Sequence, residues 1–126
     1  MRRFSVQPEF RRIVAVAAHR RVTGHCPARV HSLGTGETFE IKAVEGGFLD
    51  LASGLNVRAE DGKITIPAIA AVIDLKFVSD VWFDGFDHAS GEWFSGRAGG
   101  GATVTLYDRH QSNYFQYAVA GEDDRI

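Results

Sequence analysis

The sequence predicts an α+β domain that is mainly antiparallel β, a small barrel or sandwich of six to eight strands with one short covering helix over residues 67–76. Two observations predict this class. Hydrophobic residues make up 44% and charged residues 24% of the 126 residues, the composition of an ordinary globular protein. From residue 34 onward, short runs of alternating polar and apolar residues are separated by turn residues. A chain of this length holds one core, so residues 1–126 are expected to form a single domain with a polar tail, 121–126, that frays.

The first candidate element, residues 10–22, fits two structures. Phe10, Ile13 and Ala17 have the spacing of one helix face, whereas the β-branched run over 13–16 favours a strand. Because the rest of the chain is a sheet that needs partners, we expect a strand here. A helix is the alternative.

The middle of the chain contains the clearest strand. Residues 38–44 alternate strictly, and a short strand over 48–51 follows the Gly-Gly turn at 46–47. Asp61-Gly62 lies between two apolar runs and predicts a hairpin. Pro67 suits the first turn of a helix, and the apolar residues that follow it have helical spacing, which is why a helix is expected over 67–76.

The last third of the chain is rich in β-branched and aromatic residues. Strands are expected over 78–83, 92–95, 102–107 and 114–119. In the last of these, alternation places Tyr114 on one face of the sheet and Phe115 with Tyr117 on the other, the core face. An aromatic-rich strand at the edge of a sheet needs something to pair with it. The sequence shows no internal repeat.

These features favour a self-associating interaction module or small-ligand-binding module, expected to form a homodimer and to need no cofactor. Arg97, Trp93 and Tyr114 are the candidate ligand-binding residues, since a guanidinium and two ring systems can hold an organic ligand. No nucleophile elbow, phosphate-binding loop or dinucleotide fingerprint is present, so the sequence assigns neither a reaction nor a catalytic residue.

A metal-assisted enzyme is the first alternative. His25, Cys26 and His31 are the only close group of soft ligands, and zinc accepts both imidazole and thiolate. A further ligand would come from Asp87 or His88, in the loop between Asp84 and Glu92 that gathers acids around a glycine. The competing interpretation is a solvated turn together with a buried, unreactive Cys26.

Nucleic-acid binding is the second alternative. Residues 1–31 hold seven arginines and one glutamate, formally +6, whereas residues 32–126 hold seven bases and fifteen acids, formally −8, which sum to the net charge of −2. The arginines recur about every nine residues, a spacing that reverses their face in a helix or a strand. No continuous basic stripe results, so nucleic acid is not the expected partner.

The expected location is the cytoplasm. The single cysteine excludes an intrachain disulfide and suits a reducing compartment. The start of the chain has no secretory apolar run, and its longest mainly apolar stretch, 67–73, is too short to span a bilayer, so no membrane partner is expected. The order of Cys26, His31, Gly34, Phe39 and Ile41 is similar to the opening of some short bacterial proteins, a resemblance that implies no activity.

Overall fold

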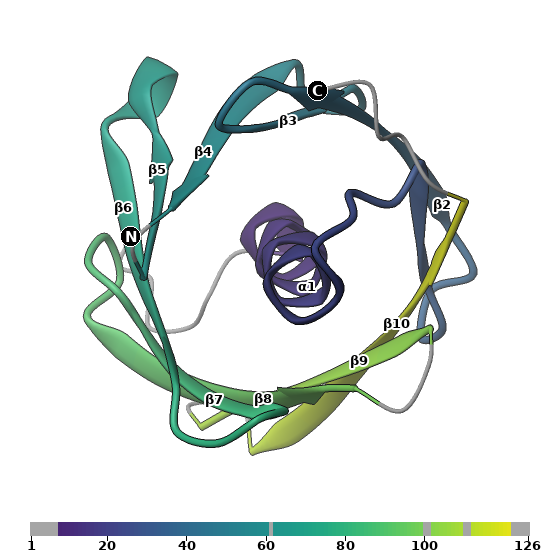
Figure 1. The fold of residues 1–126 in the computed structure, drawn as a ribbon. Coiled ribbons are helices and arrows are strands. Elements are labelled where there is room, and N and C mark those ends of the chain that lie inside the picture. The colour runs from purple at the N-terminus through teal and green to yellow at the C-terminus, as the bar shows by residue number, and fades with distance from the viewer. Residues whose placement is uncertain (1–7, 61, 100–101, 110–111, 122–126) are drawn as a thin grey trace.

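The protein is a closed antiparallel β-barrel with a helix inside it (Figure 1). The computed structural model describes residues 8–60, 62–99, 102–109 and 112–121. The wall is a continuous meander in which β1 pairs with both β2 and β10, so the sheet has no free edge. The elements are α1 (Pro8–Thr23), β1 (Arg29–Ser32), β2 (Thr38–Val44), β3 (Gly47–Asp50), β4 (Leu55–Glu60), β5 (Lys63–Ile66), the 3-10 turn η1 (Pro67–Ile69), β6 (Ala71–Phe77), β7 (Trp82–Asp87), β8 (Glu92–Ala98), β9 (Thr103–Asp108) and β10 (Asn113–Ala120).

The coarse prediction of a mainly antiparallel β fold is confirmed, but the strand count is wrong. Ten strands form the barrel, where six to eight were expected. The difference arises because the four-residue strand β1 was not expected, and because residues expected to be helical supply β6. Since the barrel closes, the expected open aromatic edge at β10 does not exist. The tail residues 122–126 lie outside the described part of the chain.

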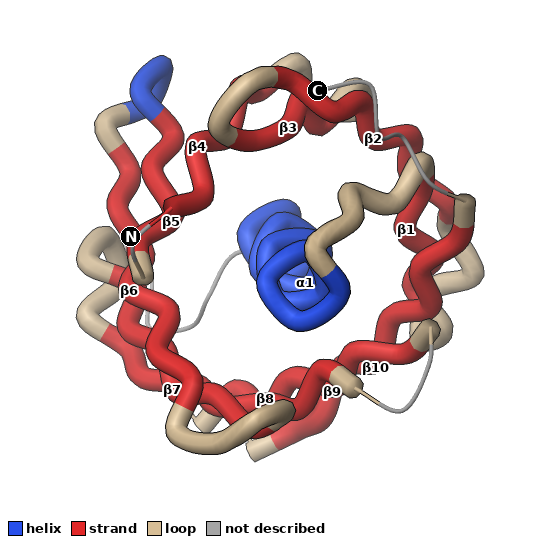
Figure 2. Tube along the Cα trace, in the orientation of Figure 1, coloured by secondary structure: helices blue, strands red, loops and turns tan. Residues whose placement is uncertain are grey.

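The expected strand over 10–22 is instead helix α1, which runs through the lumen of the barrel (Figure 2). Every residue from Ile13 to Ala18 is at most 3% exposed. A helix surrounded by protein is apolar on all sides, and this explains why its sequence lacks a polar stripe. The barrel wall uses every strand edge, so a segment in the lumen must satisfy its backbone hydrogen bonds internally, which only a helix does. The β-branched residues pack against the inner wall without changing this outcome.

The expected covering helix over 67–76 is also wrong. Pro67 starts only one 3-10 turn, which ends at Ala70 in the left-handed conformation with φ of 53°. Residues 71–77 then form β6, in which Ala71, Ile73 and Leu75 are buried and the residues between them are half-buried or exposed. This is a period-two pattern of a wall strand, and pairing with β5 and β7 on either side stabilises it.

Side chains of α1 connect it to the end of the barrel where the odd-numbered strands finish, which we call the aspartate end. Strands β3, β7 and β9 end there in buried Asp50, Asp87 and Asp108. Arg12 donates to Asp50 from Nε at 3.0 Å and from Nη2 at 2.6 Å. Arg11 Nη2 lies 3.5 Å from Asp108 Oδ2. The N-terminal part of α1 therefore lies at the aspartate end.

Two turns at the aspartate end have similar sequences. Residues 50–54 read Asp-Leu-Ala-Ser-Gly and residues 87–91 read Asp-His-Ala-Ser-Gly. In each turn the serine hydroxyl donates to the aspartate, at 2.5 Å in one and 2.9 Å in the other, and the glycine amide donates to the aspartate carbonyl at 2.8 Å. The glycine has φ near 75° in both turns, a conformation that costs glycine little.

Two inward glycines make the wall thin beside β7 and β8. Gly85 lies opposite Phe94, and Gly96 lies opposite Phe83 in the same strand pair. A Cβ atom at Gly85 would stand 2.1 Å from the Phe94 ring, so each ring covers the backbone of the facing glycine. Helix α1 packs most closely against β8, β9, β10 and β1.

Candidate functional site

The outer surface of β7 to β10 carries the exposed aromatic side chains of the protein. Within the described residues, the Trp, Tyr and Phe side chains that are more than one-third exposed are Trp82 (54%), Trp93 (53%) and Tyr114 (67%). Strand alternation places them here, because their neighbours Phe83, Phe94 and Phe115 point to the lumen side of the same strands. We call this surface the aromatic face, defined by the outward residues Trp82, Asp84, Phe86, Trp93, Ser95, Arg97, Thr105, Tyr107, Tyr114 and Gln116.

Rings on the aromatic face pair across neighbouring strands. Phe86 lies opposite Trp93 with ring centroids 4.8 Å apart, and Tyr107 lies opposite Tyr114 at the same separation. The guanidinium of Arg97 lies 5.8 Å from the centre of the Trp82 ring on the facing strand. Such pairs hold large side chains in place at the surface, so the face is preorganised for contact.

A hollow of about 320 Å³ lies between these side chains. Trp82 and Arg97 line it from β7 and β8, Tyr107 and Tyr114 line it from β9 and β10, and Ser95 and Thr105 contribute hydroxyl groups. Asp84 lies directly beside Ser95 in the strand register. The face thus combines apolar rings, hydroxyl groups, one cation and one carboxylate.

The structure brings together two of the three predicted ligand-binding residues. Arg97 and Tyr114 both line the hollow, and Trp93 lies on the same face next to Phe86, outside it. Sequence reasoning missed Trp82 and Tyr107. Strand alternation could have placed both outward, but only the strand register shows that they meet Arg97 and Tyr114.

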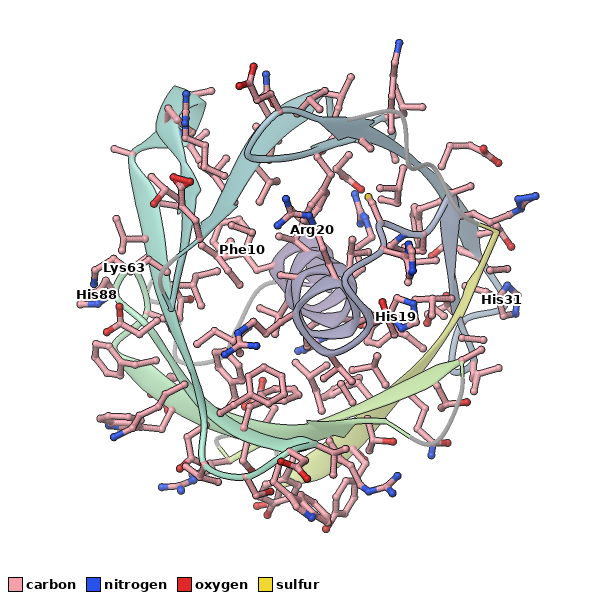
Figure 3. All side chains as sticks on the ribbon, viewed as in Figure 1. Phe10, His19, Arg20, His31, Lys63 and His88 are labelled. Atoms are coloured by element: carbon pink, nitrogen blue, oxygen red, sulfur yellow. The ribbon has the colours of Figure 1, made fainter. Side chains whose placement is uncertain are left out.

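The predicted metal ligands lie on separate parts of the barrel. His25 and Cys26 lie in the linker between α1 and β1, at the end opposite to the aspartate end, where Asp87 ends β7. His31 and His88 lie outside the wall on opposite sides of the barrel (Figure 3). No group of three or more His, Cys, Asp or Glu side chains suited to a metal is found within the part of the chain that the structure describes. The zinc hypothesis stays a prediction that these positions do not support.

Each of these residues has a local role instead. Cys26 is buried, and its thiol lies 3.6 Å from the Pro27 carbonyl oxygen. His31 Nδ1 lies 2.7 Å from the Thr38 hydroxyl on the next strand. Asp87 accepts from the Ala89 amide and from the Ser90 hydroxyl.

His88 takes part in a small surface network around Asp74. His88 Nε2 lies 3.0 Å from one carboxylate oxygen of Asp74, and Lys63 Nζ lies 2.9 Å from the other. The hydrogen bonds from Lys63 and His88 hold the pKa of Asp74 below its usual value.

The described arginines of the first quarter do not form a surface stripe. Arg11 and Arg12 are at most 9% exposed inside the barrel, and Arg20 donates to the Ala59 carbonyl oxygen at 2.9 Å. Arg2 and Arg3 lie outside the described residues. The nucleic-acid hypothesis therefore loses two of its seven arginines to buried ion pairs.

Comparison with known proteins finds no matching family, curated protein or solved structure. In the stretches that the structure describes, no helix has the length and apolar character needed to cross a membrane.

Proposed function

We propose that this protein is a self-associating interaction module whose partner is a second copy of the chain, bound through the aromatic face. The observation that carries the proposal is the gathering of Trp82, Trp93 and Tyr114, each more than half exposed, beside Arg97 on one side of the barrel. Trp, Tyr and Arg are the residues that most often dominate the binding energy of protein interfaces. The outward residues of β2, β4 and β5 are mostly polar or charged by comparison.

Charge complementarity favours a second copy over an acidic or basic partner. The aromatic face carries both a cation, Arg97, and a carboxylate, Asp84, on adjacent strands. A two-fold interface brings the same patch of each copy together and must therefore be complementary to itself. Consider a two-fold axis in the plane of the interface that crosses the line between Arg97 and Asp84 at its midpoint and at a right angle. Such an axis places Arg97 of each copy opposite Asp84 of the other.

The area and shape of the aromatic face suit contact with a second copy. Four strands about 4.8 Å apart, each with at least six residues at about 3.3 Å, measure roughly 20 Å by 20 Å, and the side chains that stand on them enlarge the accessible area. A standard interface buries roughly 800 Å² on each partner. The barrel wall is convex, so the hollow beside Tyr114 matters because it can receive a ring of the second copy.

Removing two exposed rings is expected to separate the copies. The wild-type protein should be a dimer at micromolar concentration, and Trp93→Ser combined with Tyr114→Ser should be monomeric, because hot-spot side chains contribute about 2 kcal/mol or more each. The matched control replaces two exposed residues of other strands, Lys42→Ser with Arg58→Ser, and should stay dimeric. Light scattering after size exclusion gives both masses.

A charge exchange distinguishes a direct contact from a general loss of apolar surface. Arg97→Asp and Asp84→Arg should each weaken the dimer, since each places like charges opposite one another, and the two together should restore it. A monomeric wild type, or a ring variant that stays dimeric, would show that the aromatic face does not hold a second copy.

A further inference from the structure

The aspartate end of the barrel has an open mouth, and two guanidinium groups of α1 line it. A cavity of about 530 Å³ lies there, between the N-terminal part of α1, the β1–β2 turn and the start of β10. Arg11 and Arg12 line it from the helix, and Phe39, Phe115 and Tyr117 line it from β2 and β10. This volume is within the range of small-molecule sites, which often lie in the mouths of β-barrels.

Arg11 and Arg12 differ in how closely their guanidinium groups are held by the buried aspartates. Arg12 makes a two-point contact with Asp50 and anchors the helix. Arg11 makes one longer contact with Asp108, at 3.5 Å, and its buried Nε has no hydrogen-bond partner among the described residues. Arg11 is only 7% exposed, and a buried donor without a partner is costly. The protein therefore leaves part of the hydrogen-bonding capacity of Arg11 unused, and Arg11 lines the cavity.

The surroundings of Arg11 favour a negatively charged acceptor. Arg11 and Arg12 both line the cavity, and the positive end of the α1 dipole lies at the same end of the barrel. Burial raises the pKa of the Tyr117 hydroxyl, although the charges of Arg11 and Arg12 act in the opposite direction. Tyr117 therefore stays protonated at neutral pH and can donate to an anion.

The remaining walls are apolar. The Phe115 ring lies 3.8 Å from the guanidinium carbon of Arg11, and the Phe39 ring lies 4.1 Å from that of Arg12. Leu33, which is 50% exposed, stands at the rim, and so does the carboxylate of Glu37. An acid at the rim repels a second negative charge, so the cavity suits one anionic group attached to an apolar body.

We propose that the mouth at the aspartate end binds a small organic monocarboxylate, with the carboxylate on Arg11 and Tyr117 and the apolar body against Phe39 and Phe115. The cavity shares Tyr114 and Gln116 with the aromatic face, but the proposed contacts of the carboxylate, Arg11 and Tyr117, lie outside that face and do not require self-association.

Titration with octanoate and with 3-phenylpropanoate, followed by calorimetry and by amide NMR shifts, tests the site. At least one of these two probes is expected to bind with saturation and to shift the amides of Phe39, Phe115 and Tyr117 but not those of Trp82 or Lys63. The corresponding alcohols, octanol and 3-phenylpropanol, should bind at least about tenfold more weakly, since a hydrogen bond to a charged group contributes this much or more.

Two variants locate the carboxylate. Arg11→Gln should weaken binding at least about tenfold. Tyr117→Phe keeps the packing of the ring and should weaken binding severalfold, which keeps the test decisive if Arg11→Gln does not fold. Lys42→Ala, at an exposed position of β2 that does not line the cavity, should bind like wild type. Failure of both carboxylates to bind, equal binding of the alcohols, or unchanged affinity in Tyr117→Phe would overturn the proposal.

Discussion

Arg12→Ala is expected to destabilise the protein by about 3–5 kcal/mol, because it leaves the carboxylate of Asp50 buried without its cation. Asp50 is 0% exposed and receives both Arg12 nitrogens, at 3.0 Å and 2.6 Å. The substitution also removes the contact between α1 and β3 that holds the helix at its position in the barrel. The free energy of unfolding from urea titration measures the effect.

Three comparisons show whether the buried pair causes that loss. Asp50→Ala should cost a similar amount, since it leaves the Arg12 guanidinium buried without its partner. The exposed Arg29→Ala should change stability by no more than about 0.5 kcal/mol. Replacing both partners with apolar residues, Arg12→Met with Asp50→Leu, should recover part of the stability, because desolvation of the two charges is then avoided while the Ser53 hydroxyl still loses its acceptor. A loss below about 1 kcal/mol in Arg12→Ala would mean that the pair does not hold the helix.

Gly96→Ala is expected to destabilise the protein by about 3 kcal/mol. A Cβ atom at this position would lie 2.4 Å from both the Phe83 ring and the Thr105 carbonyl oxygen. The Phe83 ring is 1% exposed and therefore enclosed by other atoms, and the carbonyl belongs to the paired strand β9, so neither gives way cheaply. Thermal and urea unfolding of the variant measure the loss.

Gly34→Ala is the matched control for Gly96→Ala. No atom lies within 4 Å of a Cβ built at Gly34, and its backbone is not left-handed. This variant should match or slightly exceed wild-type stability, because alanine restricts the unfolded chain more than glycine does. Equal stability of the two alanine variants would contradict the close packing of the wall against the helix.

The parts of the fold that the sequence predicts well are those with one solvated face. Strand β2 has the predicted bounds, 38–44, because Glu40 and Lys42 face water and Ile41 faces the core. The hairpin around Asp61-Gly62 pairs β4 with β5 as expected, and Gly62 has the positive φ of 77° that such a turn requires. Alternation and turn chemistry are local, so they can be read without knowledge of distant contacts.

Helix α1 could not be recognised by the same means. Its residues 10–18 are buried on all sides, so no polar face marks the helical period there, and the β-branched residues then favour a strand. The helix forms because a strand inside the lumen would have no partner for its backbone hydrogen bonds. This follows only from the closure of all ten wall strands, which the local sequence does not show. The available signal in the sequence was the pair Arg11-Arg12 directly before the apolar run 13–18. Arginines enclosed with such a run need acidic partners, and those acids had to come from the remainder of the chain.

The candidate sites divide in the same way. Arg97 and Tyr114 were predicted from residue type, and the strand register adds Trp82 and Tyr107 to them. The ion pairs of Arg12 with Asp50 and of Arg11 with Asp108 join residues too far apart in the sequence for spacing to suggest them. The cavity beside Arg11 follows from those pairs and from the closure of β10 on β1, so it could not be predicted.

Thiol accessibility along α1 tests most directly whether the helix occupies the lumen. In a Cys26→Ser background, single cysteines at positions 14, 15, 16 and 17 sample four directions about 100° apart around the helix. A helix inside the barrel predicts that all four react with 5,5′-dithiobis(2-nitrobenzoate) only as fast as the protein unfolds, whereas a cysteine replacing the exposed Asn56 reacts at once. Reaction at any one of the four positions at the rate of that exposed cysteine would place the helix outside the wall and contradict this fold.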